Sequence, residues 1–161
     1  MLGGVQGTEI HANKTFVFDT YNKNKGWRGG PELVFGRCLH SCGKIKAKED
    51  GDIFSIIVVG GFNVDSPTTR IASVGILDDS LYKWQAGPML PRGVSLSQLV
   101  ELPDGGIILV GGKQDKANTD LKSIFYLSHS EANWTELTQT LTLGRNCPVA
   151  FFVPDGITNC H

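Results

Sequence analysis

The sequence predicts an all-β protein built from about three copies of one four-stranded antiparallel unit. Glycine accounts for 20 of 161 residues, about 12% against a usual value near 7%, which is typical of many tight turns and strand ends. Apolar segments are short and no helical period of 3.6 residues persists anywhere along the chain. Two unrelated residue patterns also recur in step along the chain, and they define the repeat.

Tryptophan and paired glycines mark this repeat. The tryptophans lie 57 and 50 residues apart, at Trp27, Trp84 and Trp134. The Gly-Gly pairs lie 57 and 51 residues apart, at Gly3-Gly4, Gly60-Gly61 and Gly111-Gly112. Because both markers advance together, we take the period of roughly 50 to 57 residues as genuine.

Each unit opens with an arginine, at Arg37, Arg92 and Arg145, and a strand-like segment follows it: CLHSCGKIK, GVSLSQLVEL and NCPVAFFV. A turn with Asp-Gly comes next, at 49–52 and 103–106, and supplies the backbone angles that a tight hairpin needs. The second strand is β-branched and ends in Gly-Gly, as in IFSIIVVGG and GIILVGG.

A polar loop of variable length then leads to a third strand, as in TFVFD, IASVGILD and LKSIFYLS. A short turn and a fourth strand with the tryptophan complete the unit. This order predicts a four-stranded antiparallel meander. One meander cannot bury both of its faces, so neighbouring units must stack, and a curved, closed stack is a propeller. We expect each tryptophan to wedge between neighbouring units and the glycines to allow close approach of backbones.

These residues resemble the kelch repeat of β-propellers, in which a hydrophobic run ends in Gly-Gly and a later tryptophan precedes a proline. Trp27 and Trp84 are followed by Pro31 and Pro88, whereas Thr138 follows Trp134 at this spacing. The resemblance implies a partial kelch-type β-propeller of about three blades in one domain, 1–161. The units are expected at 1–36 together with 146–161, at 37–91 and at 92–145, as a fragment of a larger propeller.

Composition narrows the classes of partner. The formal net charge is -1, and no basic block provides a surface for nucleic acid. The longest apolar run, 56–59, is too short to cross a bilayer. The segment 1–14 has no signal-peptide pattern, so the sequence as written reads as cytoplasmic. An extracellular location stays open if sequence precedes Met1.

No residue is nominated as catalytic, cofactor-binding or metal-ligating. The histidines follow no known nucleophile motif and are read as surface or hydrogen-bonded side chains: His11, His40, His129 and His161. The neighbouring carboxylates belong to turns rather than to an acid/base pair: Glu49, Asp50, Asp52, Asp78 and Asp79. No GxGxxG or P-loop occurs.

The four cysteines are Cys38, Cys42, Cys147 and Cys160. On one extended strand, Cys38 and Cys42 would lie about 13 Å apart, too far for a disulfide. Zinc fits poorly, because no CxxC pair is present. Unpaired or buried thiols and a disulfide that uses Cys147 or Cys160 both remain open.

The resemblance implies a non-catalytic protein–protein interaction module. Kelch propellers present loops of variable length at one face, and here the loops at 61–70 and 112–120 are polar and unequal in length. The sequence does not identify the protein partner. Unpaired strand edges at the ends of the blade array also favour self-association.

Two other functions stay open. One is an extracellular, disulfide-containing kelch protein of unknown ligand. The other is a propeller enzyme of oxidase or sialidase type, although the three tyrosines of a copper-cage hypothesis read more simply as packing residues: Tyr21, Tyr82 and Tyr126.

Overall fold

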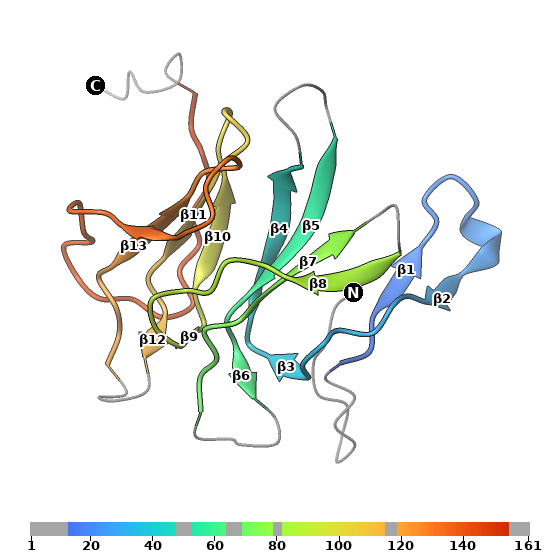
Figure 1. The fold of residues 1–161 in the computed structure, drawn as a ribbon, viewed down its shortest axis with the longest axis horizontal. Coiled ribbons are helices and arrows are strands. Elements are labelled where there is room, and N and C mark those ends of the chain that lie inside the picture. The colour runs from blue at the N-terminus through green and yellow to red at the C-terminus, as the bar shows by residue number, and fades with distance from the viewer. Residues whose placement is uncertain (1–12, 48–52, 64–68, 79–81, 115–118, 155–161) are drawn as a thin grey trace.

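The computed structural model describes residues 13–47, 53–63, 69–78, 82–114 and 119–154. Within these ranges the protein is all-β, as predicted, and the only helical element is the 3-10 turn η1 (Lys23–Lys25). None of the helices in the described ranges is long and apolar enough to span a membrane. Figure 1 shows the strands gathered into several antiparallel sheets.

Two four-stranded antiparallel sheets form the centre of the described part of the chain. The first consists of β4 (Ser41–Lys46), β5 (Phe54–Val59), β7 (Val74–Asp78) and β8 (Lys83–Ala86). The second consists of β10 (Gln98–Glu101), β11 (Ile107–Val110), β13 (Ile124–Leu127) and β14 (Thr135–Glu136). Each sheet is a meander in chain order, which confirms the predicted order of strands within 37–91 and 92–145.

Three short strand pairs accompany the two sheets. They are β1 (Phe16–Phe18) with β2 (Trp27–Gly29), β3 (Arg37–Cys38) with β6 (Phe62–Asn63), and β9 (Val94–Ser95) with β12 (Lys113–Gln114). The β1–β2 pair matches the third and fourth strands expected of the N-terminal unit; residues 1–12 lie outside the described ranges. The other two pairs were not predicted, because a two-residue pair leaves no periodicity in the sequence.

The strand expected within NCPVAFFV is not formed. Residues 146–154 are described but belong to no strand. A strand requires a neighbour that accepts its backbone hydrogen bonds, and no described strand lies beside this segment in a ladder. The prediction of a strand here is therefore wrong for the chain alone.

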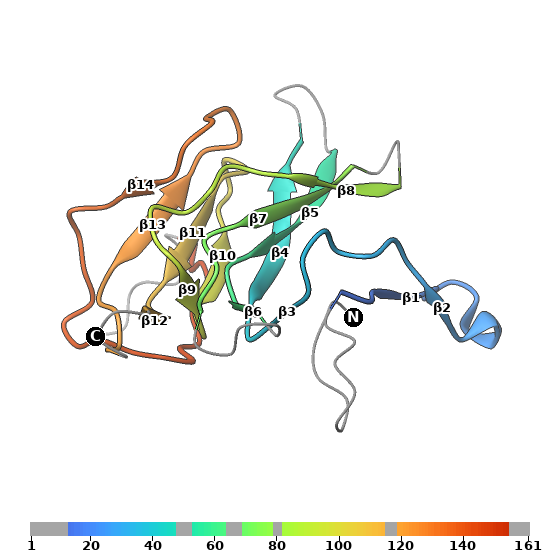
Figure 2. The ribbon, with the colours of Figure 1, turned by 60° about the horizontal axis from the view of Figure 1, so that its bottom comes forward.

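The main core lies between the two sheets (Figure 2). Alternation along β5 sends Ile57 and Val59 into this core, where they meet Leu109 and Phe125 of the second sheet. Val58 points to the opposite face and packs with Trp84 in a smaller cluster. The first sheet thus buries one face against the second sheet and only part of the other, since Phe54 and Ile56 on that face are exposed.

The predicted turns agree with the structure where they are described. Between β10 and β11, Gly105 has φ +85° and its amide donates to the carbonyl of Leu102 at 3.0 Å. The Asp104 carboxylate accepts the amide of Gly106 at 2.9 Å. The other predicted hairpin, at 49–52, lies outside the described residues.

Two of the three tryptophans behave as predicted. Trp84 and Trp134 are 2% and 6% exposed. The indole Nε1 of Trp84 donates to the carbonyl of Pro31 at 3.0 Å, and that of Trp134 donates to Pro88 at 2.9 Å. Each tryptophan therefore binds the proline of the preceding repeat. Trp27 is 61% exposed, so its expected burial is wrong in this chain.

A backbone contact also repeats from unit to unit. The amide of Leu96 donates to Leu39 at 2.9 Å, and the amide of Cys147 donates to Leu96 at 2.8 Å. All three residues have left-handed φ angles, between 49° and 57°. Leu39, Leu96 and Cys147 therefore hold one structural position in three successive units.

This alignment corrects the predicted match of the arginines. Arg37 lies two residues before Leu39, and the corresponding residues are Val94 and Arg145. The amides of Gly61 and Gly112 confirm this, since they donate to Val94 at 2.8 Å and to Arg145 at 2.7 Å. Arg92 therefore lies two residues out of step. Arg92 looked equivalent to Arg37 and Arg145 in the sequence because its distance from each falls within the range of unit lengths.

Candidate binding surface

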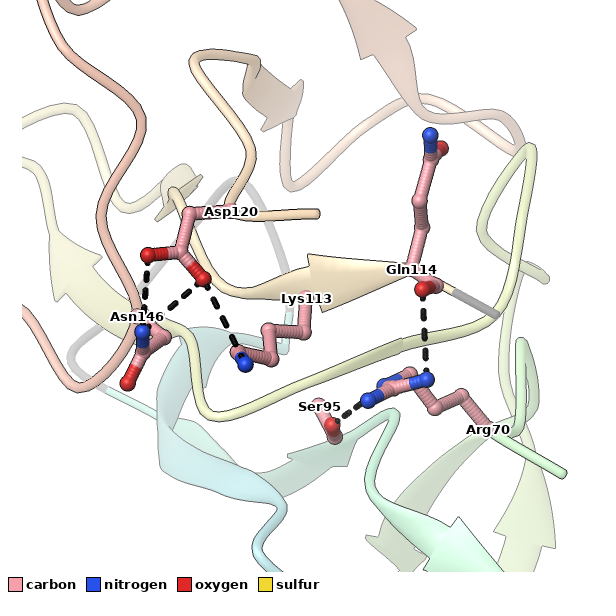
Figure 3. Close-up of polar contacts among 6 residues, drawn as sticks. All are labelled: Arg70, Ser95, Lys113, Gln114, Asp120 and Asn146. Atoms are coloured by element: carbon pink, nitrogen blue, oxygen red, sulfur yellow. Dashed lines mark hydrogen bonds and ion pairs between the residues drawn. The ribbon is translucent and has the colours of Figure 1, made fainter. Parts of the chain in front are cut away.

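The loops that follow the Gly-Gly pairs begin at one end of the two sheets. Their described parts carry Arg70, Lys113 and Asp120, and Asn146 of the following segment lies beside Asp120 (Figure 3). We call these four residues the loop-end cluster. Residues 64–68 and 115–118, the centres of both expected recognition loops, lie outside the described ranges.

Arg70 ties the first loop to the next unit. Its Nε donates to Ser95 Oγ at 2.9 Å, and its Nη1 donates to the carbonyl of Gln114 at 3.2 Å. The guanidinium also lies 4.7 Å from the ring centroid of Phe62. At 9% exposure Arg70 is a buried anchor, so the base of this loop is held rigidly against β9 and β12.

Asp120 occupies the corresponding place in the second loop. The backbone bridges Phe62–Arg70 and Lys113–Asp120 are equivalent. Asn146 Nδ2 donates to both Asp120 oxygens at 2.8 Å, and Lys113 Nζ lies 3.7 Å from Oδ1 (Figure 3). A loop-end side chain thus binds the next unit in both repeats, but arginine with serine is replaced by carboxylate with amide.

A polar hollow of about 490 Å³ adjoins Asp120. Its lining consists of residues from the loop end and from the segment after the second sheet: Asp120, Gly144, Arg145, Asn146, Cys147, Pro148 and Val149. Arg145 is exposed here, whereas Arg37 at the same structural position is 2% exposed and donates to the carbonyls of Gly60 and Ser73. The surface therefore offers a cation, a carboxylate and an amide for polar recognition.

Sequence reasoning located only part of this surface. Arg70, Lys113 and Asp120 lie within the polar loops that were expected to recognise a partner. Ser95 and Asn146 were missed, because they belong to the unit that follows each loop. A repeat alignment based on the left-handed position of Leu39 and Leu96 would have placed them opposite the loop ends.

The two described histidines lie in different units of the fold. His40 lies between β3 and β4, and His129 follows β13; His11 and His161 lie outside the described residues. Asp78 ends β7 and accepts a hydrogen bond from Gln85, while the other carboxylates of the predicted turns, Glu49, Asp50, Asp52 and Asp79, are not described. In the described part of the chain, no three histidine, cysteine or acidic side chains gather as metal ligands would.

The tyrosines also lie apart from one another in the fold. Tyr82 precedes β8 and Tyr126 belongs to β13, where its hydroxyl lies 3.4 Å from an Asp104 oxygen. Tyr21 is 101% exposed. Its interpretation as a packing residue is therefore wrong.

His40 is placed so that its charged form is disfavoured. Burial lowers the pKa of His40 to about 4, and the positive charge of Arg37 acts in the same direction. Its Nδ1 is buried without a hydrogen-bond partner among the described residues. His40 is therefore neutral in the folded protein at neutral pH.

We expect this histidine to make the fold acid-sensitive. In the unfolded chain a histidine titrates near pH 6.5, whereas folded His40 titrates near 4. Between these values the unfolded state binds a proton that the folded state does not, so the free energy of unfolding falls as pH falls from about 6.5 to 4. Urea titrations across this range should show a shallower decline for His40→Gln. An unchanged slope would contradict the assignment.

The cysteines in the described ranges are free thiols. Cys38 belongs to β3 and Cys42 to β4, so the assumption of one continuous strand is wrong: the backbone turns at Leu39, with φ 54°. Cys38 is half-buried and Cys147 is exposed, while Cys160 lies outside the described residues. Burial raises the pKa of the Cys38 thiol.

Thiol titration separates these environments. Burial shields Cys38 and raises the pKa of its thiol, and the thiolate is the reactive species. The exposed Cys147 should therefore react with Ellman's reagent well before Cys38 in the native protein. The experiment uses Cys160→Ser as background and assigns the slow phase by its loss in Cys38→Ser. A protein purified without reductant that shows fewer free thiols than cysteines would favour the extracellular, disulfide-containing alternative.

No family model matches the chain, and no curated protein matches it.

Proposed function

We propose that this chain is a non-catalytic protein-binding module, with 37–91 and 92–145 as two blades of a kelch-type β-propeller that has more blades than one copy of this chain supplies. The partner binds the loop ends beside the Gly-Gly pairs. The proposal combines a scaffold made of stacked meanders with a recognition surface whose chemistry changes from unit to unit.

The stacking supports the propeller. The inner strands of the two sheets approach closely: a Cβ on Gly43 of β4 would lie 2.6 Å from Leu99 Cδ2 of β10. Ser41 Oγ donates across the same boundary to the carbonyl of Ser97 at 2.6 Å. The tryptophan–proline contact and the backbone contact between left-handed residues both recur from unit to unit. Further units added by the same operation would therefore form a radial array.

The loop-end cluster supports the binding role, and one observation carries it. Arg70–Ser95 and Asp120–Asn146 occupy equivalent places but differ in charge and in donor pattern. An anchor with a purely structural role could use the same pair of residues in every unit. Rigid loop bases with different side chains are what a scaffold needs when loops on a fixed frame select a partner.

The experiment passes a cell extract over the immobilised wild-type chain and over two immobilised charge-reversal variants, and compares the proteins that each retains. Lys113→Glu alters the loop-end cluster. Lys83→Glu makes the same change at an exposed position of β8, which pairs with Asp78 at the end of the sheet away from the Gly-Gly pair. Quantitative mass spectrometry should find a partner that Lys113→Glu loses at least tenfold and Lys83→Glu retains. Retained proteins that respond equally to both variants would contradict the proposal.

A further inference from the structure

The two ends of the stacked array expose matching halves of the contact that joins its units. The contact occurs twice inside the chain, as Trp84 on Pro31 and Trp134 on Pro88. In both cases a buried leucine two residues after the proline packs in the cluster that contains the tryptophan: Leu33 with Trp84, and Leu90 with Trp134. One tryptophan, one carbonyl and one leucine therefore define a unit-to-unit joint.

The first half of an unused joint lies at Trp27. It begins β2, packs on Phe18 with ring centroids 5.2 Å apart, and remains 61% exposed. No described residue accepts a hydrogen bond from its indole, and the described chain places no proline-bearing unit before it. A large indole in water is an unfavourable surface that a packed joint would remove.

The second half lies beyond β14. The amide of Leu137 donates to Ile124 as that of Gly87 donates to Val74, so Thr138 corresponds to Pro88. Leu141 donates to Lys122 as Leu90 donates to Ala72, so Leu141 corresponds to Leu90. Thr138 is exposed and Leu141 is only partly buried. This end therefore presents the equivalents of the carbonyl and the leucine that receive a tryptophan elsewhere, with one more residue between them, since Leu141 is the third residue after Thr138 and Leu90 the second after Pro88.

We propose that a second copy of this chain docks head to tail, with Trp27 of one copy on the Thr138–Leu141 surface of the other. The inference rests on the unit-to-unit joint that also supports the proposed function. The β1–β2 pair and β14 lie at opposite ends of the molecule (Figure 2), so each copy can use both surfaces. Such a heterologous contact either closes into a ring or continues as a series.

Sedimentation equilibrium tests this docking. Wild-type protein should reach at least twice the chain mass of 17.4 kDa as concentration rises. Trp27→Ala and Leu141→Glu should each remain monomeric, and Thr138→Arg, at an exposed position, serves if Leu141→Glu does not fold. Tyr21→Ala, a fully exposed aromatic on the same hairpin, should associate like wild type. Larger species that Trp27→Ala abolishes would also support the contact.

Mixing the two blocked variants provides the sharper test. Trp27→Ala retains its Thr138–Leu141 surface and Leu141→Glu retains its tryptophan, so an equimolar mixture should form a pair that neither variant forms alone. A wild-type monomer at every soluble concentration, or association that persists in Trp27→Ala, would overturn the docking. A Lys113→Glu-sensitive partner found with a monomeric chain would leave the proposed function standing, so the two failures are distinguishable.

Discussion

Replacing Gly60 with alanine is expected to lower the free energy of unfolding by about 3 kcal/mol, because two costs add. Gly60 has φ +64°, a left-handed conformation that costs other residues about 1–2 kcal/mol. A Cβ there would lie 2.3 Å from the carbonyl oxygen of Val94, a backbone atom that cannot rotate away. Forced backbone shifts of this kind cost about 1–3 kcal/mol. Urea unfolding followed by tryptophan fluorescence measures the change.

The chain offers a control for each cost. Gly26 has φ +61° and open space around its Cβ position, so Gly26→Ala tests backbone strain alone. Gly93 lies outside the left-handed region, but its Cβ would lie 2.2 Å from the Arg70 carbonyl, so Gly93→Ala tests the clash alone. Gly29 has neither feature and its substitution should be nearly neutral. A Gly60→Ala cost no larger than that of Gly26→Ala would show that the units do not approach as described.

The Gly60 result bears on the joint between units as well as on one turn. Val94 belongs to the unit after Gly60, and the amide of Gly61 donates to the same Val94 carbonyl at 2.8 Å. The second pair repeats the arrangement, since a Cβ on Gly111 would lie 2.6 Å from the carbonyl oxygen of Arg145. The glycine pair is visible in the sequence because both positions have a positive φ and a backbone oxygen close to where a Cβ would lie, that of Val94 at Gly60 and that of Cys38 at Gly61.

Much of the fold was predictable because the contacts between units restrict which residues can occupy them. Tight joints need particular residues, and a joint that recurs leaves those residues at a regular spacing. The markers Gly60-Gly61 and Trp84 therefore predicted two meanders, their strand order and the buried tryptophans. The turn at Pro103–Gly106 was predictable because its backbone angles also restrict residue choice.

The candidate surface was only partly predictable. Polar, unequal loops identified where recognition residues begin, but the partner of each loop end lies in the next unit, on Ser95 or Asn146. Contacts between units depend on how the units are aligned with one another. Sequence spacing aligned Arg92 with Arg37, whereas in the structure Val94 holds that position. The β9–β12 pair is two residues long on each side, too short to impose a pattern.

Exposure of a predicted core residue had a different cause. Trp27 follows the same sequence pattern as Trp84, but burial of a joint residue requires the neighbouring unit as well as the residue itself. The same holds for the segment 146–154, whose sequence resembles a first strand but which lacks a paired neighbour in the described chain. A local sequence pattern specifies only one side of a contact between units, and burial also requires the unit that carries the other side.

Replacing Trp134 with alanine is expected to lower the free energy of unfolding by about 3–5 kcal/mol, the usual cost of removing a buried aromatic side chain. Trp134 is 6% exposed and belongs to the core that joins the two sheets. Trp134→Phe keeps an aromatic ring but removes the hydrogen bond to Pro88 and leaves that carbonyl unpaired. This narrower change should cost about 1–3 kcal/mol. Equilibrium unfolding in urea measures both variants.

Trp27→Ala is the matched control for this tryptophan. At 61% exposure it should change the free energy of unfolding by less than about 1 kcal/mol, as surface substitutions do, when the protein is dilute enough that association contributes nothing. At high concentration the same substitution should become destabilising if two copies dock through Trp27, because binding stabilises the folded state by mass action. Trp134→Ala should instead cost the same at every concentration, because both halves of its joint lie in one chain. If the costs of both substitutions changed equally with concentration, Trp134 would also depend on a second copy. That result would contradict the contact of Trp134 with Pro88 of its own chain.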